Sequence, residues 1–300
     1  MNFFELLNGT KYLILFAFLV TGPCLHAQVP TRERRALLDL YESTDGKQWT
    51  RTSDLERPVT EWQGITVRDG HVTALELFMN NLNGKVPESI GDLGHLVTLD
   101  LAFNLLSGEL PQGLASLRNP RTLKLEMNRI RGRLPDDIGK LRNLEELSAF
   151  NNFLSGEIPT GIGKLENLRI LNLSSNNLKG EIPGTMGNLG RLEILGLFDN
   201  ALEGSIPREL GNLAGPRELV LANNRLGGEI PAEFGQLTGL EVLQIQNNRF
   251  DSYGNLERMQ TERFLVFDYD REDAKREFNE IDLPRTRMAD TKFEEAAGNE

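Results

Sequence analysis

The 24-residue stretch LEELSAFNNFLSGEIPTGIGKLEN, from Leu144 to Asn167, recurs along the chain with the same spacing of leucine, asparagine, glycine and proline. Seven such units follow one another without a gap from Val72 to Gly239, and an eighth begins at Leu240. A fixed period of this length is typical of a solenoid, in which each unit packs only on its two neighbours. The repeat therefore decides the architecture of most of the chain.

Each position of the unit has its own physical task. Leu stands at the fourth position of all eight units, and Leu or Ile at the sixth in all but one, where Ala149 replaces it. This alternation predicts a short strand whose inward side chains form the core. Asn at the ninth position can pair with backbone groups in a buried turn, Gly at the thirteenth permits unusual dihedrals, and Pro at the sixteenth prevents a regular helix.

The pattern L-x-x-L-x-L-x-x-N-x-L-x-G-x-I-P resembles the plant-type class of leucine-rich repeats. The resemblance implies an α/β solenoid with a parallel β-sheet on its concave side, an irregular or 3-10 helical convex side and a helical N-terminal cap. It extends to the ectodomains of plant receptor-like proteins and to exported bacterial (Bacteroidetes-like) leucine-rich repeat proteins. A fold of this class does not by itself specify a ligand.

The sequence outside the array suggests how its ends are organised. We expect a signal peptide at residues 1–27, an N-terminal cap at 28–71, repeats at 72–250, a C-terminal cap at 251–269 and an acidic mobile tail at 270–300. In the cap, apolar residues between Ala36 and Tyr41 predict a helix, and Asp69-Gly70 predicts a hairpin turn. Beyond Phe250 the period is expected to fail, because Ser252 replaces the glycine.

Composition restricts the classes of partner. The net charge is −11, from 33 basic and 44 acidic residues, which disfavours nucleic acid and anionic membrane surfaces. The single cysteine, Cys24, lies in the predicted signal peptide, so we expect a mature protein without disulfides. We also expect no transmembrane segment after removal of the signal peptide, because no long apolar stretch follows it. Lipidation of Cys24 is the alternative to cleavage after Ala27.

No motif in the sequence indicates catalysis or a cofactor. His71 and His95 are 24 residues apart and should stack in neighbouring units, but a metal site needs more ligands than this pair. We therefore expect two exposed loop imidazoles, no metal, no cofactor and no enzymatic activity.

Outward side chains of the predicted strands, at positions 3, 5, 7, 8 and 10 of the unit, are the candidates for binding. Large apolar residues gather there in the first four units, and such a patch often marks an interface. The alternative is that these side chains pack on one another along the sheet. The candidate ligand-binding residues are Phe78, Met79, Phe103, Met127, Phe150, Asn151, Phe153, Phe198 and Asp199.

These observations predict a secreted or cell-surface module that binds a protein or peptide ligand on its concave face. The alternative is a cell-envelope protein that binds a glycan through stacked aromatic rings. We expect no nucleic-acid partner.

Overall fold

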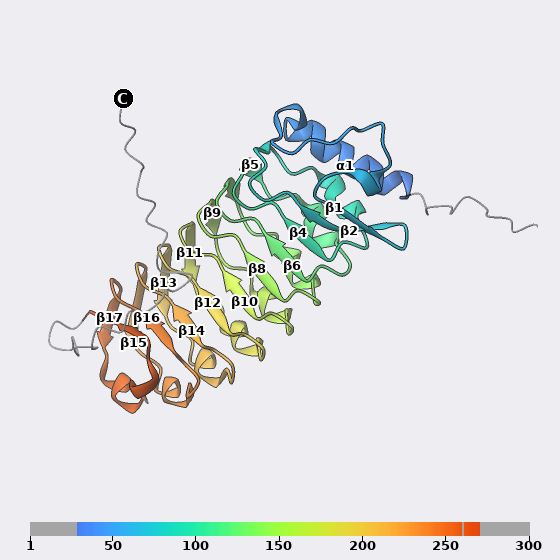
Figure 1. The fold of residues 1–300 in the computed structure, drawn as a ribbon. Coiled ribbons are helices and arrows are strands. Elements are labelled where there is room, and N and C mark those ends of the chain that lie inside the picture. The colour runs from blue at the N-terminus through green and yellow to red at the C-terminus, as the bar shows by residue number, and fades with distance from the viewer. Residues whose placement is uncertain (1–28, 260, 271–300) are drawn as a thin grey trace, which may run out of the picture.

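The 24-residue units form successive coils of an elongated solenoid in the computed structural model, which describes residues 29–259 and 261–270 (Figure 1). Helix α1 lies at the N-terminal end, and the strands follow in chain order to the other end. The predicted signal peptide lies outside the described residues, as does the predicted tail except for Asp270.

One short strand from each unit enters a 10-stranded sheet. Its strands β2 to β18 are parallel, and neighbours are in register with an offset of one unit, as where Leu147 of β8 faces Leu171 of β10. Strand β1 (Ile65–Arg68) closes the first edge antiparallel to β2. The parallel strands are β2 (His71–Glu76), β4 (Thr98–Asp100), β6 (Thr122–Lys124), β8 (Glu146–Ser148), β10 (Ile170–Asn172), β12 (Ile194–Gly196), β14 (Glu218–Val220), β16 (Val242–Gln244) and β18 (Val266–Asp268).

A second, 8-stranded parallel sheet lies beside the first, and the sequence did not predict it. It runs through the L-x-G half of each unit, where the thirteenth-position glycine has a positive φ, 80° at Gly156. Its strands are β3 (Asn83–Gly84), β5 (Leu105–Glu109), β7 (Arg129–Gly132), β9 (Phe153–Gly156), β11 (Asn177–Glu181), β13 (Ala201–Ser205), β15 (Arg225–Glu229) and β17 (Arg249–Ser252).

Short 3-10 helices complete each unit. Proline precedes each of the first seven, where it fixes φ, and the following residues make only one turn before the chain returns to the sheet. Gly139 shows how close these turns lie, because a Cβ there would stand 2.2 Å from the carbonyl oxygen of Gly161 in the next unit. The turns are η3 (Glu88–Asp92), η4 (Gln112–Ser116), η5 (Asp136–Lys140), η6 (Thr160–Lys164), η7 (Gly184–Asn188), η8 (Arg208–Asn212), η9 (Ala232–Gln236), η10 (Gly254–Arg258) and η11 (Thr261–Arg263).

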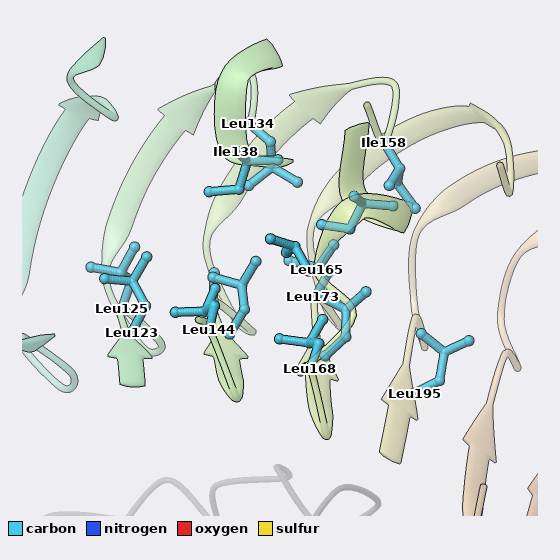
Figure 2. Close-up of a cluster of buried hydrophobic side chains, with 14 of the residues drawn as sticks. Leu123, Leu125, Leu134, Ile138, Leu144, Ile158, Leu165, Leu168, Leu173 and Leu195 are labelled. Atoms are coloured by element: carbon cyan, nitrogen blue, oxygen red, sulfur yellow. The ribbon is translucent and has the colours of Figure 1, made fainter. Parts of the chain in front are cut away.

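The core is a continuous strip between the first sheet and the 3-10 turns. Figure 2 shows its side chains pointing inward from both walls, with Leu123 on strand β6, Leu125 directly after that strand and Ile138 on the turn η5. The predicted leucine columns are fully buried, including Leu171 at 0% exposure. Ala149 is buried as well, so the one small residue of its column still faces the core.

The ninth-position asparagines form a hydrogen-bonded ladder inside the coil, as predicted. Asn152 accepts a bond from the Ile130 N–H through Oδ1 at 2.9 Å. Its Nδ2 donates to the carbonyl oxygens of Leu125 and Ala149, at 3.0 and 3.2 Å. From Asn104 onward the asparagines thereby join each unit to the preceding one, whereas Asn80 bonds to the backbone of Arg51 in the cap.

Charges alternate along the second position of the central units. The Arg121 guanidinium donates to Glu145 at 2.8 Å, and Arg169 donates to Glu193 through Nε and Nη2 at 2.8 and 3.0 Å. The Arg169 guanidinium lowers the pKa of Glu193. These pairs are exposed, so they support the register more than the stability of the array.

The two ends of the array have different caps. Helix α1 (Thr31–Ser43) buries Ala36, Leu37 and Leu40, and short turns η1 (Gly46–Gln48) and η2 (Val59–Glu61) connect it to the hairpin. Asp69 and Gly70 have φ of 50° and 77°, as the predicted hairpin turn requires.

At the other end, the consensus residues of the repeat stop after Phe250, but the 24-residue spacing of the first sheet continues for one more strand. Val266 of β18 pairs with Val242 of β16, still 24 residues away. The eighth unit therefore keeps its length although it lacks the glycine and the Ile-Pro pair, because the sheet register depends on strand spacing and not on those residues.

Candidate functional site

The eighth position of the repeat, at the end of each concave strand segment, has a left-handed backbone in all eight units. The φ values lie between 47° at Met79 and 56° at Phe103 and Asn223. Asn and Asp tolerate this conformation, whereas a bulky apolar residue is strained in it. The last five units carry Asn, Ser or Asp at this position, but the first three carry Met79, Phe103 and Met127.

Large apolar side chains form an N-terminal apolar patch on the first three units, defined here as Phe78, Met79, Phe103 and Met127. Phe78 is 42% exposed and Met79 is 60% exposed. The Phe78 and Phe103 rings pack against each other with centroids 5.1 Å apart and planes tilted by 55°. The Arg51 guanidinium fixes the adjacent backbone by donating to the Phe78 carbonyl at 2.7 Å. The patch thus combines exposed apolar surface with strained backbone.

The expectation that position 7 is open to solvent holds in only some units. Ala102, Glu126, Ser174 and Ala222 are buried there. Phe150 and Phe198 are half-buried. The concave surface is therefore formed mainly by position 8 and by the longest side chains of position 7.

A second apolar cluster lies at the other end of the first sheet, and sequence reasoning missed it. We define the C-terminal apolar patch as Ile194, Phe198, Val220, Val242 and Val266. Val220 and Val242 are its buried centre, and Phe198 packs against them. The signal was present at positions 3 and 5 of the later units, where β-branched residues replace polar ones.

Of the remaining candidate residues, Asn151 and Asp199 adjoin the patches and Phe153 lies apart from them. Asn151 and Asp199 are exposed at position 8, and Asn151 Nδ2 donates to the Met127 sulfur. Phe153 is 56% exposed but belongs to the second sheet, where it lines a groove with Lys85, Arg129 and Arg131. The structure therefore does not bring Phe153 together with the concave residues.

Glu126 is a buried carboxylate at the floor of the concave face, between the Phe103 and Phe150 units. It is 9% exposed, and its Oε2 has no hydrogen-bond partner among the described residues. Burial raises the pKa of Glu126, Asp100 raises it further, and a hydrogen bond from Ser148 opposes the shift. A half-satisfied buried carboxyl facing a surface is a feature of functional sites more than of stable cores.

Glu126→Gln is expected to stabilise the protein by about 1 kcal/mol at neutral pH, because an incompletely paired buried charge is removed. The folded protein binds the Glu126 proton more tightly than the unfolded chain does. The carboxyl therefore destabilises the fold only as pH rises above its unfolded pKa of about 4.3. The gain should be present at pH 7 and vanish below pH ~4 in denaturant melts. Gln246 occupies the same repeat position, so glutamine fits the backbone. A gain that persists unchanged at low pH would contradict this account.

The charged side chains near the N-terminal apolar patch are mainly acidic. Glu76 and Asp100 lie near the N-terminal apolar patch, while Glu146 is paired with Lys124 at 3.4 Å. Arg225 of β15 and Arg249 of β17 are exposed near the C-terminal end, but both lie on the second sheet, at the same repeat position as Phe153. The two arginines therefore stand apart from the concave face, as Phe153 does.

These features define a leucine-rich repeat solenoid with a two-ended concave surface. Models of leucine-rich repeats match residues 95–117, 142–189 and 216–237. No curated protein matches the sequence of the chain. None of the helices within residues 29–259 and 261–270 is long and apolar enough to cross a membrane.

Similar solved structures come from plants and bacteria. The ectodomain of the Arabidopsis thaliana receptor kinase GASSHO1/SCHENGEN3, in complex with CASPARIAN STRIP INTEGRITY FACTOR 2, is 32% identical with a TM-score of 0.74. The alignment covers 79% of this chain and 29% of the ectodomain. The Arabidopsis HAESA ectodomain, with an IDA peptide hormone, is 26% identical with a TM-score of 0.60, over 80% of this chain and 44% of that one. A leucine-rich repeat protein of Leptospira interrogans is 32% identical with a TM-score of 0.55, over 64% and 47%. This chain therefore spans less than half the length of each of these neighbours.

Proposed function

We propose that this protein is a non-catalytic interaction module that binds a peptide or an extended protein segment along its concave face. The observation that carries the proposal is the backbone strain at Met79, Phe103 and Met127. Strain of this kind costs on the order of 1–3 kcal/mol per residue and persists where function needs it. Asn at equivalent positions of later units provides the unstrained alternative.

The ligand that fits this surface has an apolar segment next to a basic group. The N-terminal apolar patch offers desolvated anchoring area, and aromatic and Met side chains supply much of the binding energy at such sites. A Lys or Arg of the ligand would be attracted to the exposed carboxylate of Glu76 and the half-buried one of Asp100 beside this patch.

The structural neighbours support a peptide as the ligand class. The two Arabidopsis ectodomains are in complex with CASPARIAN STRIP INTEGRITY FACTOR 2 and with an IDA peptide hormone. The proposal includes export: cleavage after Ala27 would deliver a secreted or surface-exposed protein, in keeping with the ectodomain neighbours. N-terminal sequencing of the exported protein tests the cleavage site.

A glycan ligand is the second candidate, because the Phe78 and Phe103 rings form an exposed aromatic pair. Sugar stacking favours Trp and Tyr over Phe, and the candidate residues at positions 7, 8 and 10 include neither. A glycan array provides the direct comparison.

The test is peptide selection from a random display library against the protein, followed by affinity measurement on variants. The Met79→Asn/Met127→Asn double variant should bind the selected peptides about 30-fold more weakly, or about 2 kcal/mol. Its melting temperature should stay the same or rise, because Asn relieves the left-handed backbone. Phe150→Ala should weaken binding similarly without early melting.

Lys179→Ala, at an exposed site on the second sheet, is the matched control and should leave affinity unchanged. The proposal fails if the double variant keeps full affinity, or if Phe150→Ala melts early and binds normally. Selective binding on the glycan array with no peptide enrichment would favour the glycan candidate.

A further inference from the structure

Three side chains capable of binding a metal meet where the N-terminal cap joins the array: Glu33 of α1, His71 at the start of β2, and His95 just before β4. Their ligand atoms all lie within 4.8 Å of one another. His71 Nδ1 is 2.6 Å from Glu33 Oε1, and His95 Nδ1 is 3.6 Å from the same oxygen. Sequence analysis found the two histidines but not the carboxylate, which comes from an element 38 residues before His71.

The fold brings these groups together for two separate reasons. The histidines occupy the same position of consecutive units, and their rings stack with centroids 3.6 Å apart. Helix α1 covers the first units and points Glu33 at both rings. The expectation of two exposed loop imidazoles was therefore wrong for His71, whose side chain is 34% exposed and bonded to a buried carboxylate.

Glu33 is built into the fold as a fixed carboxylate. Its side chain is 6% exposed, and its Oε2 accepts a hydrogen bond from the Val72 N–H at 2.8 Å. That bond holds one oxygen and leaves Oε1 directed at the imidazoles. A backbone bond to a carboxylate in this way orients metal ligands in known sites. The His95 side chain is 53% exposed, so the cluster is open to solvent on that side.

We propose that Glu33, His71 and His95 form a binding site for a divalent transition metal of the Zn²⁺ class. Two imidazole nitrogens and one carboxylate oxygen are ligands that Zn²⁺ favours, and three protein ligands leave a fourth position for water. In a tetrahedral site with ligand bonds of about 2.0–2.1 Å, ligand atoms are roughly 3.3 Å apart. The observed distances of 2.6 and 3.6 Å lie on both sides of this value. Because the two rings are stacked with planes 24° apart, their Nδ1 lone pairs are nearly parallel, so the rings must splay apart for both nitrogens to face one ion. The metal then replaces the hydrogen bond between Glu33 and His71.

Mg²⁺ and Ca²⁺ do not fit this site, because they prefer sets of oxygen ligands and two of the three ligands here are nitrogens. A bound transition metal would tie the cap helix to the first two units. The proposal is independent of the concave ligand, since the cluster includes none of the residues of either apolar patch.

The experiment is calorimetric titration of ZnCl₂ into the full chain prepared without a polyhistidine tag, together with thermal melts. The wild type should bind one Zn²⁺ and melt roughly 5 °C higher at saturation. His95→Asn should reduce Zn²⁺ affinity by at least about tenfold while the metal-free melting temperature stays unchanged. Asparagine is the matched replacement, because Asn119 and Asn143 occupy the same repeat position and bond to each other at 3.1 Å. Glu33→Gln, which can still accept the Val72 bond, should lose affinity similarly.

The absence of Zn²⁺ binding by the wild type up to about 1 mM would overturn the proposal. The cluster would then be only a structural contact between the cap helix and the array. Equal binding by the wild type and both variants would overturn it as well, because the metal would then sit elsewhere. An equal response to MgCl₂ would show general attraction to carboxylates and not this site.

Discussion

Leu171→Ala is expected to lower the free energy of unfolding by about 2–5 kcal/mol. Leu171 is completely buried at the centre of β10, with Leu147 and Leu195 as its neighbours in the adjoining strands. The truncation removes apolar contact and leaves a cavity that rigid neighbouring units fill poorly. Urea or guanidinium melts followed by circular dichroism measure the loss.

Asn177→Ala is the control for this prediction, because Asn177 is exposed in the same unit. Its expected effect is within about 0.5 kcal/mol. Equal losses of unfolding free energy at the two positions would mean that the fourth-position leucines do not form the core. Because units interact only with neighbours, the loss should also broaden the unfolding transition if it uncouples the two halves of the array.

Asn152→Ala should be destabilising to a similar degree, about 2–4 kcal/mol, although it removes no apolar surface. The Ile130 N–H loses its side-chain acceptor in the interior, and three Nδ2 contacts to carbonyl groups disappear. The carbonyls of Leu125 and Ala149 keep bonds from Asn128 and Asn176, so the unpaired N–H dominates the cost. Amide exchange at Ile130 provides a local readout beside the global melt.

Asn143→Ala removes the same amide from an exposed site that makes one side-chain bond, to Asn119. A change within about 0.5 kcal/mol is expected there. An equally small loss of unfolding free energy in Asn152→Ala would mean that water replaces the lost hydrogen bonds. The asparagines would then not be needed to pair the buried backbone groups.

The candidate surface could be predicted in part from its columns of residues. Phe78, Met79, Phe103 and Met127 were found because their position in the unit marks them as outward from the strand. The left-handed backbone at position 8 could also have been predicted, because Asn, Ser or Asp stands there in each of the last five units. The burial of Glu126 could not be predicted from the sequence, because the exposure of the seventh position differs from unit to unit.

The sequence by itself determined the period, the leucine core, the asparagine ladder and the strand register. These properties follow from a pattern that repeats every 24 residues, because equivalent side chains then pack in the same way in each unit. Tertiary structure alone decided the second sheet, the packing of Phe198 into the C-terminal apolar patch, the placement of Phe153 on another surface and the meeting of Glu33 with His71 and His95. Each of these depends on contacts between units, or between the cap and the array, and a column of residues carries no information about how the cap helix is oriented on the first coil.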